Sequence, residues 1–417
     1  MASEMVKEVR ESWKTPSVMG SVALVIFVFF GILGRPDSVA FQLSGPRETI
    51  QLPNLDIGSS LLGSVLGVLL LAITGVAAWR VSQNKKVPIG LSLVFGAISL
   101  VALLGWLASG SVVPVAFILG SALVLSVPIV LGAMAGVMSE RVGVVNIAIE
   151  GQLLTGAFMA AVVSTITGNQ ILGLVSAALT AALFSAVLAV FAVRFLAQQI
   201  IIGVVLNVLA IGITNFLYQQ WLTEDESATN SPGTLPIISV PFLSDIPILG
   251  PVLFQNRITV FMAIAIVILI WFVLFKTKLG LRARAVGEHP LAADTVGINV
   301  GRTRFWWVTL GGMIAGLGGA TLTIGSAGAF GREMSGGLGF IALAVVILGR
   351  WHPGYATAAA LLFGFSIILR IWANQVSPGI PTSFITMVPY LVTLIAVVGF
   401  VGRSRPPAAD GIPYVKG

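Results

Sequence analysis

Residues 257–275 read RITVFMAIAIVILIWFVLF, and no charged residue follows Arg257 in this run. At about 1.5 Å per residue, a helix needs roughly 20 apolar residues to cross the hydrocarbon core of a bilayer. Eleven other runs of this kind follow one another along the chain. Their approximate bounds are 19–34, 58–79, 89–109, 112–138, 142–164, 171–194, 199–221, 303–325, 333–349, 354–373 and 384–401.

The composition agrees with this pattern. Of the 417 residues, 57% are hydrophobic and only 9% are charged, and the mean hydropathy is +1.01. Soluble domains carry roughly 25% charged residues, so a protein folded in water is excluded. The expected fold class is therefore all-α, a polytopic transmembrane bundle of about 10 to 12 spans.

Two of the runs are weaker than the others. The run 112–138 is interrupted by Pro114 and Pro128, and the run 333–349 is short after Gly336. Either could be a broken or re-entrant helix that is buried in protein. Twelve spans are expected if both cross the bilayer, and about 10 or 11 if they do not.

The sequence contains no recognisable enzyme active site. Cysteine is absent, which excludes disulfides, thiolate metal sites and cysteine nucleophiles. His289 and His352 stand alone in polar connections, so neither a metal nor another cofactor is expected. No G-x-x-x-x-G-K-[ST] phosphate-binding loop and no catalytic set occurs. If ATP drives this protein, another polypeptide must hydrolyse it.

The net charge of +7 and the pI near 10.1 indicate orientation in a membrane rather than nucleic-acid binding. The basic residues lie between the apolar runs, where they set the orientation of the spans. If the N-terminus is cytoplasmic and sides alternate at every run, most of the 23 Lys and Arg residues fall inside. The outside receives Arg35, Arg47, Arg257, Arg332 and Arg370. Both termini are therefore predicted to be cytoplasmic.

Three regions are expected along the chain. The first 18 residues, MASEMVKEVRESWKTPSV, are charged and precede a run without a small-residue cleavage pattern, which predicts an uncleaved tail. Residues 1–110 combine this tail with about three extra spans and no chemical motif. We expect them to be an addition to a core at 111–402, which a cytoplasmic tail at 403–417 follows.

The basic loop 276–302 on the predicted inside contains a candidate docking element. Within it, PLAADTVG (290–297) begins with proline, continues with small residues and ends with glycine, which predicts a short helix. Such a helix on the cytoplasmic face could dock a partner protein. An ordinary basic loop, held at the lipid headgroups by Arg282 and Arg284, is the equally weighted alternative.

A second candidate site is ERVGVVNIAIEGQ (140–152), which carries Asn146, Glu150 and Gln152 into an apolar run. An acidic side chain in a span costs roughly 2.5 kcal/mol or more unless it is paired, protonated or wetted. Asn146 and Glu150 are four residues apart, so on a helix they would share one face. That face could line an aqueous pathway, or it could be a clamp between helices.

Two further patterns are explained at least as well by helix packing. Gln198, Gln199, Asn207 and Asn215 form a milder polar series along the run 199–221. Interhelical hydrogen bonds account for them at least as well as substrate contact does. In GGMIAGLGGA (311–320), small residues recur at 312, 316 and 320 on one helical stripe. This stripe predicts close packing against another helix.

Three separated motifs resemble one family of membrane proteins. They are SERVGVVNIAIEG (139–151), GEHPLAADTVGINV (287–300) and FIALAVVILG (340–349). Their order is similar to that in ABC permeases of the ribose and branched-chain amino acid type, over roughly 111–400. The first motif is most similar to that of the nucleoside importer permeases.

The resemblance implies a type II-like importer core in the bacterial plasma membrane. It implies a pore of two identical or homologous permeases in membrane lipid, an ABC ATPase on the cytoplasmic side, and an external binding protein or lipoprotein. The region 140–152 would lie near the translocation path, with Asn146, Glu150, Gln152 and Asn207 as candidate residues. The coupling helix for the ATPase would include Gly287, Glu288, Pro290, Ala292, Ala293, Asp294 and Gly297.

Several alternatives stay open at this point. The transported solute could be a simple sugar or a branched-chain amino acid instead of a nucleoside. An ion-coupled secondary transporter should show several embedded carboxylates, whereas Glu150 is the one well-embedded acid found. An export channel or a structural membrane scaffold would carry no small solute.

Overall fold

A computed structural model describes residues 12–45, 48, 50–223, 226–376, 387 and 405–416. The predicted span 384–401 lies, apart from Met387, outside the described residues. The contacts divide the chain into two compact units, and the larger unit includes Leu119–Ser244 and Leu249–Ile368.

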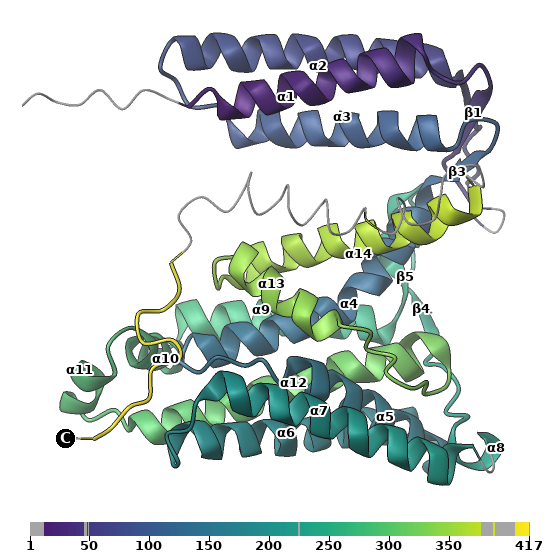
Figure 1. The fold of residues 1–417 in the computed structure, drawn as a ribbon. Helices are drawn as coiled ribbons and strands as arrows, with labels where there is room; N and C mark the ends of the chain where they lie inside the picture. Colours follow the sequence, from purple (N-terminus) through teal and green to yellow (C-terminus); the bar gives the residue numbers. More distant parts are fainter. Residues whose placement is uncertain are drawn as a thin grey trace, which may run out of the picture. The chain divides into compact units, whose positions relative to one another are not determined.

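The smaller unit contains three apolar helices. They are α1 (Lys14–Val25), which continues as a π-helix over Ile26–Ile32, α2 (Ser59–Ser82) and α3 (Ile89–Leu107), and they lie side by side (Figure 1). Glycines on α2 allow close contact with the first helix, since a Cβ at Gly67 would lie 2.7 Å from Phe27 Cα. A small sheet in the order β2-β1-β3 joins the connecting segments: β1 (Ser38–Gln42), β2 (Leu55–Gly58) and β3 (Val112–Pro114).

The larger unit holds most of the remaining helices. Its long helices are α4 (Val115–Glu140), α5 (Ile149–Thr167), α6 (Gln170–Val193), α7 (Gln199–Leu217), α9 (Ile258–Lys276), α12 (Val300–Leu322) and α14 (Pro353–Val376). Its shorter elements are α8 (Glu226–Thr229), β4 (Ile237–Ser239), β5 (Gln255–Arg257), α10 (Lys278–Glu288), α11 (Pro290–Thr295) and α13 (Leu338–Leu348). π-Helical turns extend α7 over Tyr218–Leu222 and α12 over Thr323–Ala327, and another covers Gly250–Phe254.

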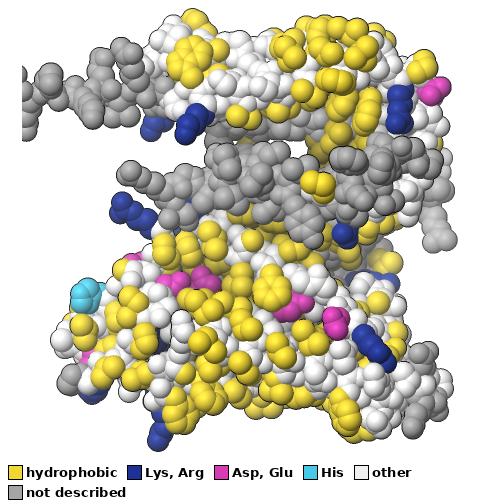
Figure 2. Space-filling view, viewed as in Figure 1, with side chains coloured by type: hydrophobic (Ala, Val, Ile, Leu, Met, Phe, Trp, Pro, Cys, Tyr) yellow, Lys and Arg dark blue, Asp and Glu magenta, His cyan; other side chains and the backbone are white. Residues whose placement is uncertain are grey.

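The apolar character of the helices confirms the predicted fold class. Among the described residues, ten helices are long and apolar enough to cross a membrane. In α9, only 28% of the most apolar window is buried inside the protein, so most of its side chains are at least partly exposed. Figure 2 shows hydrophobic side chains along the helices of the larger unit and Lys and Arg side chains toward the helix ends. This surface suits a multi-pass protein in lipid.

The two weak runs behave differently from each other. In the run 112–138, residues 112–114 with Pro114 belong to β3, and one continuous helix, α4, begins at Val115. Pro128 lies inside this helix, so a break at Pro128 is wrong. The run 333–349 contains α13, which has only 11 residues. At about 1.5 Å per residue this helix measures roughly 17 Å, too short to cross a hydrocarbon core of about 30 Å.

The predicted span 142–164 also requires a correction. Its helix, α5, begins at Ile149, because residues 141–148 form turns and irregular backbone instead. Gly143 has a φ of +82°, which a right-handed helix cannot contain. Asn146 therefore lies before the helix, and the expectation that it shares a helical face with Glu150 is wrong.

The core of the larger unit is a tightly packed group of α5, α6 and α12. A Cβ at Gly156 would lie 2.6 Å from Gly316 Cα, and a Cβ at Gly312 would overlap Ser185. A Cβ at Gly319 would overlap the carbonyl oxygen of Leu153. The close packing predicted from the small-residue stripe is thus confirmed, and it gives the polar residues at the start of α5 a rigid support.

Candidate functional site

The residues before α5 form a buried polar junction. Asn146 and Gln152 exchange two hydrogen bonds, from Asn146 Nδ2 to Gln152 Oε1 and from Gln152 Nε2 to Asn146 Oδ1, each of 3.2 Å. Both side chains have 0% exposure. This pair ties the loop 141–148 to the first turn of α5, and each amide satisfies the other in a place that water does not reach.

Helix α7 supplies further partners to the same junction. Asn207 Oδ1 accepts a hydrogen bond of 2.8 Å from Gly151 N, and Asn207 Nδ2 donates one of 2.8 Å to Ile147 O. Gln199 Oε1 accepts a bond of 2.8 Å from Val145 N. These side chains satisfy backbone groups that the irregular loop leaves without helical partners. The polar series on α7 is therefore used, at these two positions, for holding the loop.

Glu150 faces a different neighbour, the start of α13. Its Oε1 accepts bonds from Ser335 Oγ at 2.7 Å and from Gly337 N at 2.8 Å, and its Oε2 accepts one from Gly339 N at 2.6 Å. The first backbone N–H groups of a helix lack helical partners and carry partial positive charge. A carboxylate at this place satisfies them, and the buried Glu150 is accordingly a cap for α13.

The approach of α13 to α5 depends on glycine. Gly336 and Gly337 have φ values of +52° and +85°, which turn the chain into the helix, and Gly337 is the residue that precedes α13. A Cβ at Gly339 would lie 2.5 Å from Glu150 Cα. The short helix thus begins inside the protein, directly on the first turn of α5.

The structure brings all four candidate path residues to one place. Asn146, Gln152 and Asn207 hold the loop and the first turn of α5, while Glu150 holds α13. Each already has protein partners, which favours the clamp over a freely exposed lining. A carboxylate and three amides at the start of a broken helix nevertheless form the polar centre of an apolar bundle.

The sequence-based reasoning missed the segment that leads to α13. Asn215 Nδ2 donates a bond of 3.1 Å to Glu333 Oε1, and the guanidinium of Arg332 lies 5.2 Å from the ring centre of Tyr218. Phe330 exchanges hydrogen bonds with Asn230, through Phe330 N at 2.7 Å and Phe330 O at 3.0 Å. The glycines at 328, 331, 336 and 337 mark this segment in the sequence, but they do not reveal its partners.

At the other candidate site, the predicted short helix is confirmed. α11 runs over Pro290–Thr295, with proline at its first position. His289 Nδ1 caps it by accepting a bond of 3.2 Å from Ala292 N. Gly297, at a φ of +85°, ends it, and Gly297 N donates to Asp294 O. The residues Gly287 and Glu288 lie at the end of the preceding helix, α10.

The side chains of α11 divide into a buried and an exposed set. Ala293 is only 2% exposed and packs in an apolar cluster with Val286 and Val300. Leu291 on the helix and Val296 directly after it are 58% and 74% exposed. Exposed large apolar residues on a short helix form a surface that a partner protein can cover.

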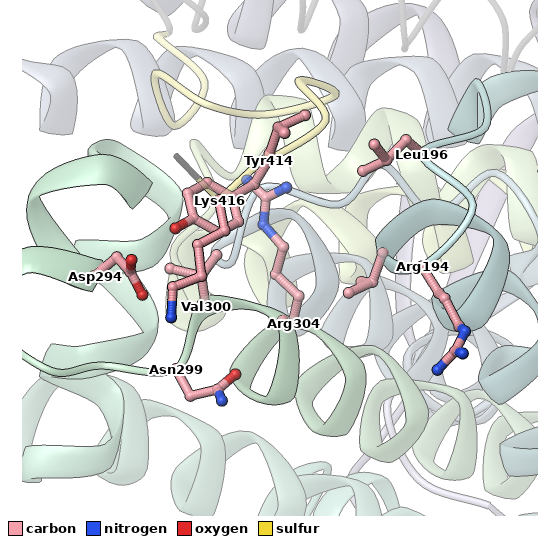
Figure 3. A pocket seen from close by; sticks show the side chains of 11 residues that line it. Arg194, Leu196, Asp294, Asn299, Val300, Arg304, Tyr414 and Lys416 are labelled. Carbon is pink, nitrogen blue, oxygen red and sulfur yellow. The ribbon is translucent and has the colours of Figure 1, made fainter.

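A pocket of about 350 Å³ lies beside this helix (Figure 3). Among the predicted site residues, Asp294 lines it. Its other charged or polar lining residues are Arg194, Asn299, Arg304, Tyr414 and Lys416. The pocket is therefore formed by α11, the start of α12, the end of α6 and the C-terminal segment.

Burial shifts the titration of groups that connect these segments. It raises the pKa of Asp410 from 3.8 to about 7, although the Gly411 backbone and Arg304 act in the opposite direction. Burial also lowers the pKa of the Arg141 guanidinium, and Glu288 partly offsets this shift. Burial and the charge of Arg141 lower the pKa of His352. Charges are thus concentrated where α10, the loop 141–148 and the C-terminal segment meet.

Comparison with known proteins connects this architecture to one family. A family model described as "Branched-chain amino acid transport system / permease component" matches residues 118–397. The matched range covers more than half of the chain and includes both candidate sites. No solved structure shows a significant match.

Individual relatives extend the comparison. The chain is 41% identical over 310 residues to the guanosine ABC transporter permease protein NupQ of Bacillus subtilis, covering 72% of this chain and 97% of that protein. It is 40% identical over 309 residues to the nucleoside ABC transporter permease protein NupC of Lactococcus lactis, covering 72% and 96%. It is 34% identical over 250 residues to the putative glucose ABC transporter permease protein TsgC13 of Haloferax volcanii, covering 60% and 75%.

Proposed function

The chain belongs to the family of branched-chain amino acid transport system permease components, and we propose that it is the membrane-spanning subunit of an ATP-driven nucleoside importer. A permease component is a transport subunit and not an enzyme. The observation that carries the choice of nucleosides is the 41% and 40% identity to permeases named for guanosine and nucleosides, over nearly their whole length.

Contacts on one side of the larger unit support the proposed orientation. Arg141 Nε donates a bond of 2.9 Å to Trp351 O, and Arg304 Nη1 donates one of 2.9 Å to Ile412 O. With sides alternating at every span, Arg141, Arg304, Arg350 and the tail 403–417 were all assigned to the inside, and these bonds join those residues or their direct neighbours. Because this side carries most of the basic residues, we place it in the cytoplasm.

Contacts among the segments assigned to the outside support the same arrangement. Gln170 Nε2 donates a bond of 3.2 Å to Pro232 O, and Asn230 bonds the backbone of Phe330. α13 fits this topology as a helix that returns from the interior junction to the inner side, since the chain just after it reaches Arg141. We therefore propose that both termini are cytoplasmic and that the protein resides in a bacterial plasma membrane.

The energy for transport would come from a separate subunit. The sequence contains no phosphate-binding loop, and the ABC transporter family implies an ATPase. We propose that this ATPase docks on α11, because Leu291 and Val296 are exposed there while Ala293 anchors the helix to the bundle. The coupling residues Gly287, Glu288, Pro290, Ala292, Ala293, Asp294 and Gly297 then act as one docking unit with α10.

The remaining partners follow from the same proposal. A second permease, identical or homologous, would complete the pore, and an external binding protein or lipoprotein would deliver the nucleoside. No covalent step takes place in this chain. Residues 1–110 are proposed to be an addition to the permease core at 111–402, with a cytoplasmic tail at 403–417, which is supported by the start of the family match at residue 118.

We propose that the junction of α5 and α13 lies beside the translocation path. α13 is a half-length helix held at its first turn by Glu150, so a small movement of α5 would shift the whole of α13. Access could then alternate by rigid-body movement of packed helices, as broken helices permit in other transporters. The hydrogen bonds of Asn146, Gln152 and Asn207 would make the loop 141–148 move together with α5.

Uptake in cells tests the substrate. Labelled guanosine, adenosine, ribose and leucine are offered to a deletion strain and to the same strain carrying the gene, with and without ATP depletion. We expect only the nucleosides to depend on the gene and on ATP. If uptake of ribose or leucine depends on the gene and uptake of nucleosides does not, the proposed substrate is wrong, but the chain is still a permease. Uptake that persists without ATP would favour a secondary transporter.

The comparisons favour one further substrate class for the same test. A relative at 34% identity is named a putative glucose permease, and the family description names branched-chain amino acids. Uptake of labelled glucose is therefore measured in the same assay. Competition by unlabelled glucose against labelled guanosine would show whether both enter by one path.

A further inference from the structure

The C-terminal segment 405–416, here named the C-terminal strap, is bound to the end of α10. Ala409 N donates a bond of 2.9 Å to Gly287 O, and Ala408 N donates one of 3.3 Å to Glu288 Oε2. Ala409 is buried by this contact. Two of the residues assigned to the docking unit therefore hold the strap, immediately before α11 begins.

Arg304 connects the strap to the loop before α5. The side chain lies on α12 and is only 1% exposed. Its Nε donates a bond of 3.0 Å to Val142 O, and its Nη1 donates one of 2.9 Å to Ile412 O. A planar guanidinium holds several donors in a fixed fork, so Arg304 can join two backbone carbonyls from distant segments at once.

The segments also approach too closely to slide freely. A Cβ at Gly143 would lie 2.8 Å from Ala409 O, and a Cβ at Gly287 would overlap Arg141 O. Tyr414 packs partly buried against the apolar cluster that contains Val142 and Ala293. Figure 3 shows Tyr414 and Arg304 side by side beside the pocket. The strap, α10–α11 and the loop 141–148 thus form one packed assembly.

We propose that the C-terminal strap transmits movement of α11 to the loop 141–148, and that Arg304 is the positioning residue that keeps this connection. The inference rests on the proposed function, because it assumes that an ATPase moves α11. The connection continues from the loop through Asn146 to Gln152 on α5, and from Glu150 to α13. ATP-driven movement then reaches the interior junction through the strap as well as through α10.

The main test measures coupling in the complete transporter, reconstituted with its ATPase, partner permease and binding protein. The variants are Arg304→Gln and deletion of residues 405–417, and the readout is ATP hydrolysed per nucleoside imported. The matched control is Arg302→Gln, which removes an exposed cation two residues away on the same helix. We expect the ratio to rise by about fivefold or more in both test variants and to stay unchanged in the control.

A structural defect alone would lower import and the amount of folded transporter without raising this ratio. Folded amount is measured by size-exclusion chromatography, and Arg304→Lys serves as the conservative variant. Lysine retains the charge but lacks the fork, so we expect an intermediate ratio. A ratio within about twofold of the wild type in Arg304→Gln and in the deletion would overturn the proposal, because this is below the usual range of coupling between sites.

A second measurement needs no substrate. The chain has no cysteine, so Ala408→Cys with Glu288→Cys introduces one thiol pair at the strap contact. In the control pair, Ala408→Cys is combined with Lys278→Cys at the other end of α10, about 15 Å from Glu288. A short bismaleimide should join the first pair several times faster than the control pair. Equal rates would show that the strap is not bound to the end of α10.

The two measurements separate the failure of this inference from the failure of the proposed function. Efficient cross-linking with no nucleoside import would support the contact between the strap and α10, and it would show that nucleosides are not the substrate. Coupling would then be measured with whichever of ribose, glucose or leucine is imported. If nucleosides are imported but the cross-linking rates are equal and the coupling is unchanged, the proposed role of the strap is wrong and the proposed function stands.

Discussion

Two junctions of the larger unit hold a short helix by similar chemistry but in different surroundings. The interior junction caps the 11-residue α13 with the carboxylate of Glu150, and the surface junction caps the 6-residue α11 with the imidazole of His289. In the interior, Glu150 and the amides behind it are buried. At the surface, Leu291 on α11 and Val296 directly after it are exposed.

This difference teaches how each helix can be used. Buried polar groups must keep their partners, because an unsatisfied group costs about 1–3 kcal/mol. α13 is therefore tied to α5 and moves only with it. α11 is anchored through Ala293 and capped by a group that water could replace, which is the arrangement that the proposed docking of an ATPase needs. The comparison predicts that changes in the interior affect folding and transport, whereas changes at the surface affect coupling.

The largest effect is expected at Glu150. Glu150→Gln retains an oxygen acceptor but places an amide N–H against a donor at the start of α13, so the cap is incomplete. We expect nucleoside uptake to fall about tenfold, equivalent to about 1.4 kcal/mol, while the folded amount falls much less. Uptake and folded amount are measured in the same membranes. Equal uptake per folded molecule would restrict Glu150 to holding α13.

Glu150→Ala is the companion change for this prediction. It removes the carboxylate that accepts three hydrogen bonds. The backbone N–H groups of Gly337 and Gly339 and the hydroxyl of Ser335 then lose their acceptor. The expected loss of stability is on the order of 3 kcal/mol or more, measured by thermal denaturation in detergent. Unchanged stability would mean that water fills the site, and the clamp interpretation would be wrong.

The next effect concerns the docking surface. Replacing Pro290, Ala292 and Ala293 together with bulky charged residues should abolish stimulation of the ATPase. Since Ala293 is buried, the sharper variant is Leu291→Glu, which leaves the anchor intact. We expect about a tenfold weaker association with the ATPase, since a central apolar residue of an interface contributes about 1–2 kcal/mol. Normal recruitment would place the docking surface elsewhere.

A smaller effect is expected from pH. Burial raises the pKa of Asp410 to about 7, so the docked strap binds this proton more tightly than a released strap would. Docking is then strongest below about pH 4 and weakens as the pH rises to about 7. Glu140 on α4 and Arg304 on α12 face the same carboxyl group.

The cross-link between positions 408 and 288 measures this dependence. Its rate, corrected with the control pair at each pH, should fall at least about threefold from pH 5 to pH 8. Asp410→Asn should remove most of the fall, because an amide does not titrate. An unchanged slope in this variant would assign the pH dependence to another group.

The smallest effect is expected at the end of α11. Gly297→Ala puts a side chain at a φ of +85°, where nothing lies within 4 Å of the new Cβ. Backbone strain of about 1 kcal/mol should loosen α11 and speed its amide hydrogen exchange, with little change in uptake. Gly287→Ala is the contrasting change, since its Cβ would overlap Arg141 O and should disturb the strap as well.

The local features of both junctions were predictable from the sequence. Pro290 and Gly297 mark α11 because one restricts φ and the other permits a positive φ. The stripe of small residues on α12 predicts close packing for a similarly local reason. Asn146, Glu150 and Gln152 stand out because polar residues are rare in apolar runs. The expectation that Asn146 and Glu150 share a helical face was wrong, because spacing alone does not show where a helix begins.

The sequence by itself determined the membrane class, nearly all spans within the described residues and the position of the short helix α11. These follow from apolar run length, charge placement and backbone preferences, which act over a few neighbouring residues. Only the tertiary structure decided that Glu150 caps α13, with Ser335 lying 185 residues away, and that Arg304 bonds Ile412 across 108 residues. Such pairs depend on how helices pack, and no local pattern records which distant donor reaches a buried acceptor.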